Sequence, residues 1–209
     1  THYTYGEKIL PVDSIQVSLK YATNTGTSSK DFTLFRTHHG PITHSEDEHW
    51  ISTALMWSPI KALKQSFTRT KKSNHNEFHE MMDIRTNSSN NTVYADADGT
   101  IAYYHGNFIP VRDEKFDYTK PVDGSNPATD WNGLHKLEEN IFVKTPPTHW
   151  IQNCNSTPFS SAAEYSPKKE DYPKYMSSFP ENFRGIHAIP LLKKAEDLTL
   201  KSLIKLAYD

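Results

Sequence analysis

Two residues of the sequence carry groups that could act as a covalent nucleophile. Cys154 is the single cysteine, and a thiol becomes nucleophilic when a nearby histidine takes its proton. Thr1 offers a hydroxyl for which its own α-amino group could serve as the base. A lone cysteine is more often a small buried apolar residue, and any chain that begins with threonine presents the same two groups. From the residues alone, neither is assigned as a nucleophile.

The 11 histidines raise the question of a metal site. Four of them lie between residues 38 and 49, but none of these four forms the His-x-x-x-His pair that zinc enzymes carry on a helix. His75 and His79 have that spacing, yet the glutamate that follows the first histidine in zinc proteases is missing. Asp96 and Asp98 lack the further oxygen ligands of a calcium loop, so a plain turn is predicted there. The sequence therefore predicts no metal site and implies no cofactor.

Composition excludes several classes of protein. The 209 residues, with a mass of 24.0 kDa, suffice for one domain with one core. Lys and Arg total 23 and Asp and Glu total 25, and this net charge of -2 argues against a nucleic-acid partner. No apolar run approaches the roughly 18 residues of a membrane span, so no membrane association is expected. A hydrophobic content of 35% is lean for a single soluble domain.

The first part of the chain reads as strands followed by helices. Alternating apolar residues predict a β-hairpin over 14–36, with a longer polar loop at 24–30, and an apolar-rich run predicts a third strand over 50–57. A helical pair follows over 58–86. Ser58 and Pro59 are a typical helix start, and Asn74 is a candidate cap for the second helix.

The second part holds one clear hairpin and long loops. A strand, an Asp-Gly turn and a strand are predicted over 91–105. Residues 106–149 are rich in proline and are predicted as a loop region. A short strand over 150–153 leads into a loop that ends at Pro158, and apolar spacing predicts a C-terminal helix over 189–208, with Asp197 or Thr199 as a cap inside it. These elements alone indicate an α+β domain.

Four motifs, in this order and spacing, resemble the penicillin acylase family. The resemblance extends from about Phe32 to Lys194 and so covers most of the chain, with Gly106, Pro110 and Arg112 continuing the second motif. The motifs are FRTHHGP at 35–41, YADADGTIAY at 94–103, DWNGL at 130–134 and WIQNCNSTP at 150–158.

The resemblance implies both a fold and a reaction. The fold is part of the αββα four-layer sandwich of N-terminal-nucleophile hydrolases, with mostly antiparallel sheet and helices. The reaction is hydrolysis of the amide bond of an N-acyl substrate, of the β-lactam side chain, N-acyl homoserine lactone or lipopeptide class. In this family a serine hydroxyl exposed by self-cleavage attacks the carbonyl. Its freed α-amine, with an unperturbed pKa of about 7.7–8.0, is the base.

Two residues of this chain match site residues of the family. Asn155 corresponds to the asparagine of the oxyanion hole, whose amide N–H stabilises the developing negative charge. Arg184, in the stretch 182–185, corresponds to an arginine that supports the site. Each residue has a structural alternative, because Asn155 could form an Asx-turn before Pro158 and Arg184 could form an ion pair.

The sequence departs from the family at its start. Thr1–Gly6 resembles a stretch inside the family's β-chain, so we expect residues 1–209 to be a single incomplete domain that lacks the nucleophile and is inactive alone. The expected partners are the rest of the precursor, namely the α-chain and the N-terminal segment of the β-chain. Tyr118 falls near the family's calcium position, but carboxylate ligands are missing, so no metal is assigned.

Three further expectations follow from the resemblance. The parent protein is expected to be periplasmic or secreted. The lean apolar content implies a shared core, so apolar surface should be left exposed for a partner chain or a second copy. Two alternatives stay open, a stand-alone β-rich module that binds a glycan or peptide and a catalytically dead acylase-like scaffold.

Overall fold

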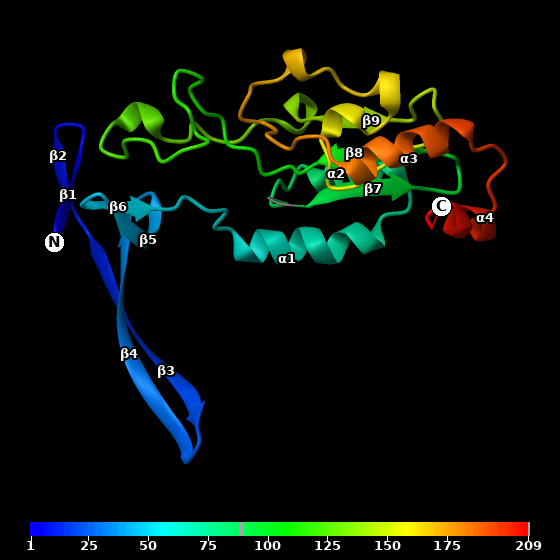
Figure 1. Ribbon diagram of the computed structural model, residues 1–209. Helices are drawn as coiled ribbons and strands as arrows, with labels where there is room; N and C mark the ends of the chain where they lie inside the picture. The colour runs from blue at the N-terminus through cyan, green and yellow to red at the C-terminus, as the bar shows by residue number, and fades with distance from the viewer. Residues whose placement is uncertain (88–89, 209) are drawn as a thin grey trace. The chain divides into compact units, whose positions relative to one another are not determined.

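The computed structural model describes residues 1–87 and 90–208, and the chain divides into two compact units (Figure 1). Unit 1 comprises Thr1–Trp57 and Arg112–Asn132, and unit 2 comprises Ser58–Val111 and Gly133–Asp209. Antiparallel sheets and helices occur together, which confirms the expected α+β class. The expectation of one incomplete domain stays a prediction, because compact units can be parts of a single larger domain.

Unit 1 consists of antiparallel strands joined by short turns. β1 pairs with β2, and β3 to β6 pair with one another in chain order. The second segment of the unit, Arg112–Asn132, is a loop with a 3₁₀ turn at Pro127–Thr129. The strands are β1 (His2–Tyr5), β2 (Lys8–Pro11), β3 (Asp13–Thr23), β4 (Gly26–Thr37), β5 (Gly40–Glu46) and β6 (His49–Ser52).

The hairpin predicted over 14–36 is confirmed, but its predicted loop at 24–30 is wrong. Thr23 pairs with Gly26, so the turn is only Asn24–Thr25. The polar residues that follow Gly26 continue β4 because each one pairs with a residue of β3, and such cross-strand pairs stabilise a ladder whatever the polarity of one strand. Figure 1 shows the paired ribbons of β3 and β4 reaching well away from the other strands of unit 1.

The apolar side chains of this hairpin are exposed. Ile15, Leu19 and Leu34 expose 53%, 54% and 52% of their surface, although the alternation of β3 is that of a half-buried strand. About half of each of these side chains is therefore open to solvent. This result agrees with the expectation that the chain leaves apolar surface exposed.

The turn between β4 and β5 consists of two histidines. Thr37 pairs with Gly40, so His38 and His39 form the turn itself. Gly40 has φ 150°, and a side chain there would collide with the Thr53 carbonyl. The predicted third strand over 50–57 is too long, because β6 ends at Ser52. Thr53 N still donates to Pro41 O at 2.9 Å, after which the chain leaves the sheet.

Unit 2 has a three-stranded antiparallel sheet in the order β7-β8-β9. The predicted hairpin over 91–105 is confirmed as β7 (Asn91–Ala95) and β8 (Ile101–His105). Its turn is held by Asp96, whose Oδ1 accepts from the backbone N–H groups of Asp98 and Thr100 at 3.1 and 2.9 Å. β9 (Phe142–Lys144) was not predicted, because three residues are too few to show a period.

The two faces of β8 carry the two parts of the unit's core. Ala102 and Tyr104 face one side, and Tyr103 faces the other with Val143 and Ala162, as expected for successive residues of a strand. Helix α2 (His75–Met82) covers the first face with apolar residues at helical spacing. The buried cluster on that face is Phe78, Met81, Met82, Ala102, Tyr104 and Leu137.

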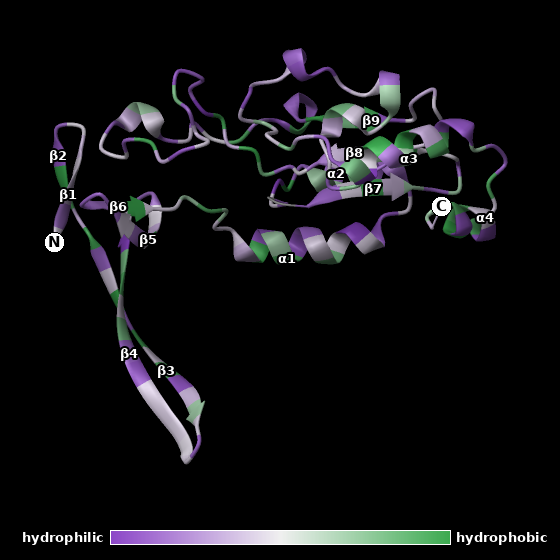
Figure 2. Ribbon diagram, viewed as in Figure 1, coloured by the Kyte–Doolittle hydropathy of each residue, from purple (hydrophilic) through white to green (hydrophobic). Residues whose placement is uncertain are grey.

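The predicted helical pair over 58–86 is confirmed as α1 (Pro59–Thr68) and α2. Asn74 caps α2 by accepting from Glu77 N at 3.0 Å. α1 places its apolar stripe outward, since Ile60, Leu63 and Phe67 expose 77%, 67% and 69% of their surface. Figure 2 shows apolar residues recurring along this helix.

Two predictions for the C-terminal part are wrong in detail. Residues 150–153 are not a strand, because this segment runs inside loops and Gln152 N donates to Ser161 O. The helix predicted over 189–208 is two helices, α3 (Phe183–Lys194) and α4 (Leu200–Leu206). α3 begins earlier because Asn182 caps it, and the predicted cap Thr199 begins α4. In the described part of the chain, no helix is both long enough and apolar enough to cross a membrane.

Candidate functional site

Asn155 and Arg184, the two predicted site residues, lie in contact. Asn155 is in the loop that follows residues 150–153, and Arg184 is in the first turn of α3. The guanidinium Nη2 of Arg184 donates a hydrogen bond to Oδ1 of Asn155 at 3.2 Å. The fold of unit 2 therefore brings together two residues that are 29 positions apart in the sequence.

Asn182 holds the loop and the helix to each other. Its Oδ1 accepts from Gly185 N at 3.0 Å and so caps α3, while its Nδ2 donates to the carbonyls of Cys154 and Asn155 at 3.0 and 3.2 Å. Both the oxygen and the nitrogen of the Asn182 amide thus form hydrogen bonds that join the loop to the helix. No role for Asn182 was predicted from the sequence, although an asparagine before a helix is a recognisable cap signal.

The underside of the loop is tightly packed. Ser156 is 3% exposed, and a side chain added at Gly185 would come within 2.8 Å of its hydroxyl. Gln152, also buried, accepts from Cys154 N through Oε1 at 3.0 Å and donates through Nε2 to Ser160 O at 3.1 Å. Gly185 is therefore needed for the close approach of α3 to the loop.

The contact with Arg184 decides which way the Asn155 amide points. A guanidinium has only donors, so Asn155 must present its oxygen to Arg184. Its Nδ2, with two N–H groups, is left for another acceptor. Asn155 has φ 53°, a left-handed conformation that asparagine tolerates better than most residues, and both side chains are exposed. The arrangement can donate a hydrogen bond to an oxygen that carries negative charge.

The two nucleophile candidates belong to different units. Cys154 is half-buried beside Asn155, and in the described part of the chain no histidine hydrogen-bonds its thiol. Thr1 belongs to unit 1, where its carbonyl accepts from Val12 N at 3.0 Å.

His75 and His79 form part of an aromatic cluster. The Tyr104 hydroxyl lies 3.0 Å from His75 Nε2 and 3.1 Å from His79 Nδ1, on the core side of α2. Burial, with smaller effects of Lys144 and His79, lowers the pKa of His75. The pair is thus packed against the sheet, and the position of these histidines is explained by core packing.

The carboxylate next to Tyr118 takes part in a local turn. Asp117 Oδ1 accepts from Thr119 N and Oγ1 at 3.1 and 2.6 Å. No metal is assigned at Tyr118. Over residues 1–87 and 90–208, the one group of three or more His, Cys, Asp or Glu that could share an ion is His38, His39 and Asp130.

Three comparisons relate the chain to known proteins. The model of the penicillin amidase family matches residues 1–209. Penicillin G acylase of Escherichia coli is 29% identical over 134 residues, which are 62% of this chain and 16% of that protein. The structure of a thermostable penicillin G acylase from Alcaligenes faecalis matches with a TM-score of 0.78 at 18% identity, over 98% of this chain and 35% of that chain.

These comparisons differ in what they establish. The structural match, at its low identity, shows the fold and confirms the fold expected from the sequence motifs. The chain spans only about a sixth of the length of the curated relative. The activity, substrates and partners of the whole protein are therefore matters for proposal.

Proposed function

The chain belongs to the penicillin amidase family, and we propose that it is a portion of an amidohydrolase that cleaves the amide bond of an N-acyl substrate. The substrate classes that suit this reaction are β-lactam side chains, N-acyl homoserine lactones and lipopeptides. The parent protein is periplasmic or secreted. The nucleophile, its amine base and the second oxyanion donor come from segments outside these 209 residues.

In this proposal Asn155 is the oxyanion donor supplied by the chain. Attack on the amide carbonyl moves an electron pair onto the carbonyl oxygen, and the Nδ2 group of Asn155 donates a hydrogen bond to that oxygen. The observation that carries the proposal is the 3.2 Å bond from Arg184 to Oδ1, because it turns the amide so that its N–H groups face away from the helix. A donor fixed in advance stabilises the transition state without reorganising.

Arg184 is a positioning residue in this account. It does not touch the substrate but sets the orientation of the Asn155 amide. Asn182 holds the same loop through the carbonyls of residues 154 and 155. The family's calcium ion has no part in the proposal.

The remainder of the acylase is the partner that the chain requires. The exposed stripe of α1 (Ile60, Leu63 and Phe67) and the exposed apolar residues of the β3–β4 hairpin support this proposal. Large apolar side chains that cluster on a surface mark sites of contact with other protein. This chain covers 35% of the matched acylase chain, which agrees with a piece whose core is completed by other segments.

The experiment is alanine substitution at Asn155 in the intact parent protein, with hydrolysis of aryl-acetamides, penicillins and N-acyl homoserine lactones as the assay. Loss of one oxyanion donor should lower kcat by about 10²–10³-fold. The matched control is Asn153→Ala, which removes a nearby asparagine that bonds Asn91 instead. If both variants keep the parent kcat, the oxyanion role is wrong.

A second test addresses the segments missing from this chain. The isolated 209 residues should not turn over any of these substrates, because the nucleophile is elsewhere. Robust turnover by the isolated chain that is abolished by Thr1→Ala, with the fold retained, would show that Thr1 is the nucleophile and overturn this part of the proposal.

A further inference from the structure

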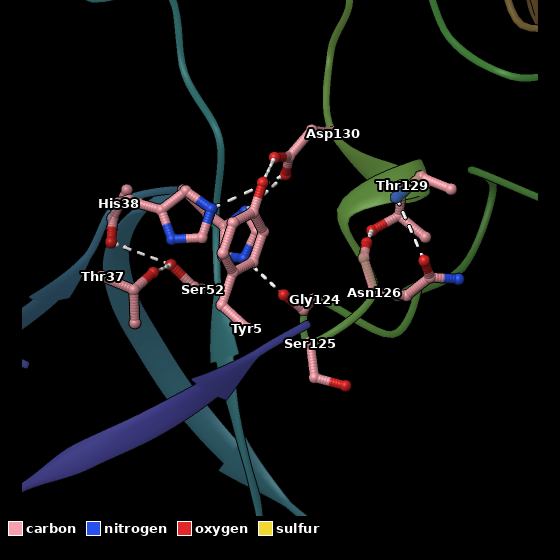
Figure 3. Close-up of polar contacts among 12 residues, drawn as sticks. Tyr5, Thr37, His38, Ser52, Gly124, Ser125, Asn126, Thr129 and Asp130 are labelled. Atoms are coloured by element: carbon pink, nitrogen blue, oxygen red, sulfur yellow. Dashed lines mark hydrogen bonds and ion pairs between the residues drawn. The ribbon is translucent and has the colours of Figure 1, made fainter. Parts of the chain in front are cut away.

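His38, His39 and Asp130 form a cluster within unit 1 that the acylase chemistry does not use. The two histidines are the turn between β4 and β5, and Asp130 directly follows the 3₁₀ turn Pro127–Thr129. Figure 3 shows Asp130 approaching the His38 ring from the loop that lies opposite the strands. The cluster is partly open, since the three side chains expose 35%, 18% and 30% of their surface. An ion from solvent could therefore reach it.

The ligand atoms are spaced as a small metal ion requires. Asp130 Oδ1 lies 3.3 Å from His39 Nδ1 and 3.7 Å from His38 Nε2, and one ligand atom of each residue lies within 4.8 Å of the other two. A tetrahedral ion with bonds of about 2.0–2.1 Å holds its ligand atoms about 3.3 Å apart. The two contacts of Asp130 are close to this spacing, and the two histidine ligand atoms, which lie within 4.8 Å of each other, would have to approach when an ion binds.

Each of the three side chains is held by a partner on its other polar atom. His39 Nε2 lies 2.8 Å from the Gly124 carbonyl, His38 Nδ1 lies 2.6 Å from the Tyr3 hydroxyl, and Asp130 Oδ2 accepts from the Tyr5 hydroxyl at 2.5 Å. Metal-binding histidines nearly always have such an outer partner, which fixes the tautomer and the orientation of the ring. The cluster thus has a complete outer layer.

The outer partner of His39 sets the direction of the lone pair on its ring. A carbonyl only accepts hydrogen bonds, so a neutral His39 carries its hydrogen on Nε2 and turns the lone pair of Nδ1 toward the Asp130 carboxylate. With His39 neutral, two electron-rich atoms face each other at 3.3 Å, and either a proton or a metal ion between them would stabilise the pair.

We propose that His38, His39 and Asp130 bind one divalent transition-metal ion of the zinc class, with water in the fourth position. Two imidazoles and one carboxylate suit Zn²⁺ or Co²⁺, whereas Ca²⁺ and Mg²⁺ prefer oxygen ligands. The ion would fasten the Arg112–Asn132 loop to the β4–β5 turn. Sequence spacing could not reveal this site, because Asp130 comes from a distant segment.

The test is a titration of the metal-free 209-residue chain with Zn²⁺ by calorimetry and with Co²⁺ by visible absorption. One equivalent should bind, and Co²⁺ should give the intense absorption of a tetrahedral site. His38→Gln and Asp130→Asn should each weaken binding by more than 100-fold. Tyr3→Phe, which removes an outer partner and keeps the ring, should weaken it by about 10–100-fold.

The matched control is His44→Gln, a histidine on β5 outside the cluster, which should bind as the parent chain does. Thermal unfolding and circular dichroism show which variants are folded. If Asp130→Asn does not fold, Tyr3→Phe still provides a valid test. The proposal is overturned if the chain binds no Zn²⁺ at millimolar concentration. It is equally overturned if His38→Gln and Tyr3→Phe bind Zn²⁺ as tightly as the control.

Discussion

At the scale of residues, the orientation of one amide carries most of the functional argument. Asn155 has both a donor and an acceptor, and only the donor is useful to a developing oxyanion. Arg184 takes the acceptor, while Asn182 fixes the backbone on which Asn155 stands. The site therefore depends on three polar residues, of which one would act on the substrate.

Arg184→Leu should reduce kcat of the parent protein by up to about 10²-fold, because a misplaced catalytic group can cost that much. KM should change little, since Arg184 does not touch the substrate. Arg184→Lys should restore part of kcat by keeping a donor near Oδ1. The control is Lys193→Leu, which removes another cation of α3, one that pairs with Glu164 at 2.7 Å. A large KM effect with unchanged kcat at Arg184 would contradict a positioning role.

Sequence motifs predicted Asn155 and Arg184 but not their partners. Asn182 lies in the same stretch as Arg184, yet its bonds to Cys154 O and Asn155 O exist only because the fold closes α3 onto the loop. Likewise, four histidines between residues 38 and 49 were visible, but Asp130 joins two of them through tertiary structure alone. Motifs report local order, and these contacts are not local.

At the scale of elements, the start of α3 is the part that positions the site. Apolar spacing predicted a helix start at residue 189, whereas the Asn182 cap begins the helix at Phe183. The strand predicted at 150–153 is a loop held by Gln152. In a segment of four residues, a periodic pattern cannot distinguish a strand from a loop. Predictions were correct where the local signal is strong, namely at the Ser58-Pro59 start of α1, the Asn74 cap of α2 and the 91–105 hairpin.

Asn182→Ala should destabilise the chain by about 0.5–2 kcal/mol, the usual cost of losing a helix cap, and should also lower kcat of the parent protein because the Asn155 loop loses its clamp. Asn74→Ala is the matched control, since it removes the same kind of cap from α2. It should cost similar stability and leave kcat unchanged. Equal effects of both variants on kcat would show that stability alone is responsible.

His105 on β8 should make the stability of unit 2 depend on pH. It is 7% exposed, lies 3.3 Å from the Tyr103 hydroxyl and meets the edge of Phe179, and burial lowers its pKa. Below about pH 6.5 the unfolded chain takes up a proton that the folded chain resists. Stability should thus be complete above pH 6.5 and fall below it, by at most about 1.4 kcal/mol per pH unit for this histidine.

Urea unfolding at several values between pH 7.5 and pH 5.5 measures this dependence, with His105→Gln as the comparison. The variant should show a smaller loss of stability over the same range. A parent chain whose stability is flat across this range would contradict the assignment.

At the scale of the whole molecule, the distribution of apolar residues is the informative feature. Ile60, Leu63 and Phe67 have helical spacing, but α1 leaves them exposed and buries Gln65 instead. Gln65 accepts from Thr86 N and Oγ1 at 2.8 and 2.6 Å. Periodicity identifies an apolar face without showing which molecule covers it. An incomplete core explains both this face and the lean hydrophobic content of the sequence.

Replacing Ile60, Leu63 and Phe67 with glutamine should change the stability of the isolated chain by less than about 0.5 kcal/mol for each residue, as for exposed positions. The same triple variant should destabilise the parent protein, in which the stripe is expected to be covered. Thermal unfolding of both forms measures the difference. A large loss in the isolated chain would place the stripe in its own core and contradict the shared-core account.

The most direct test of the account is Asn155→Asp in the intact parent protein, with kcat and thermal unfolding measured together. Aspartate keeps the size, tolerates the left-handed backbone and can pair with Arg184, so Tm should be unchanged or higher. It replaces two N–H donors with a negative charge, so kcat should fall by at least about 10²–10³-fold. A variant that keeps both its Tm and the parent kcat would show that Asn155 is structural and not the oxyanion donor.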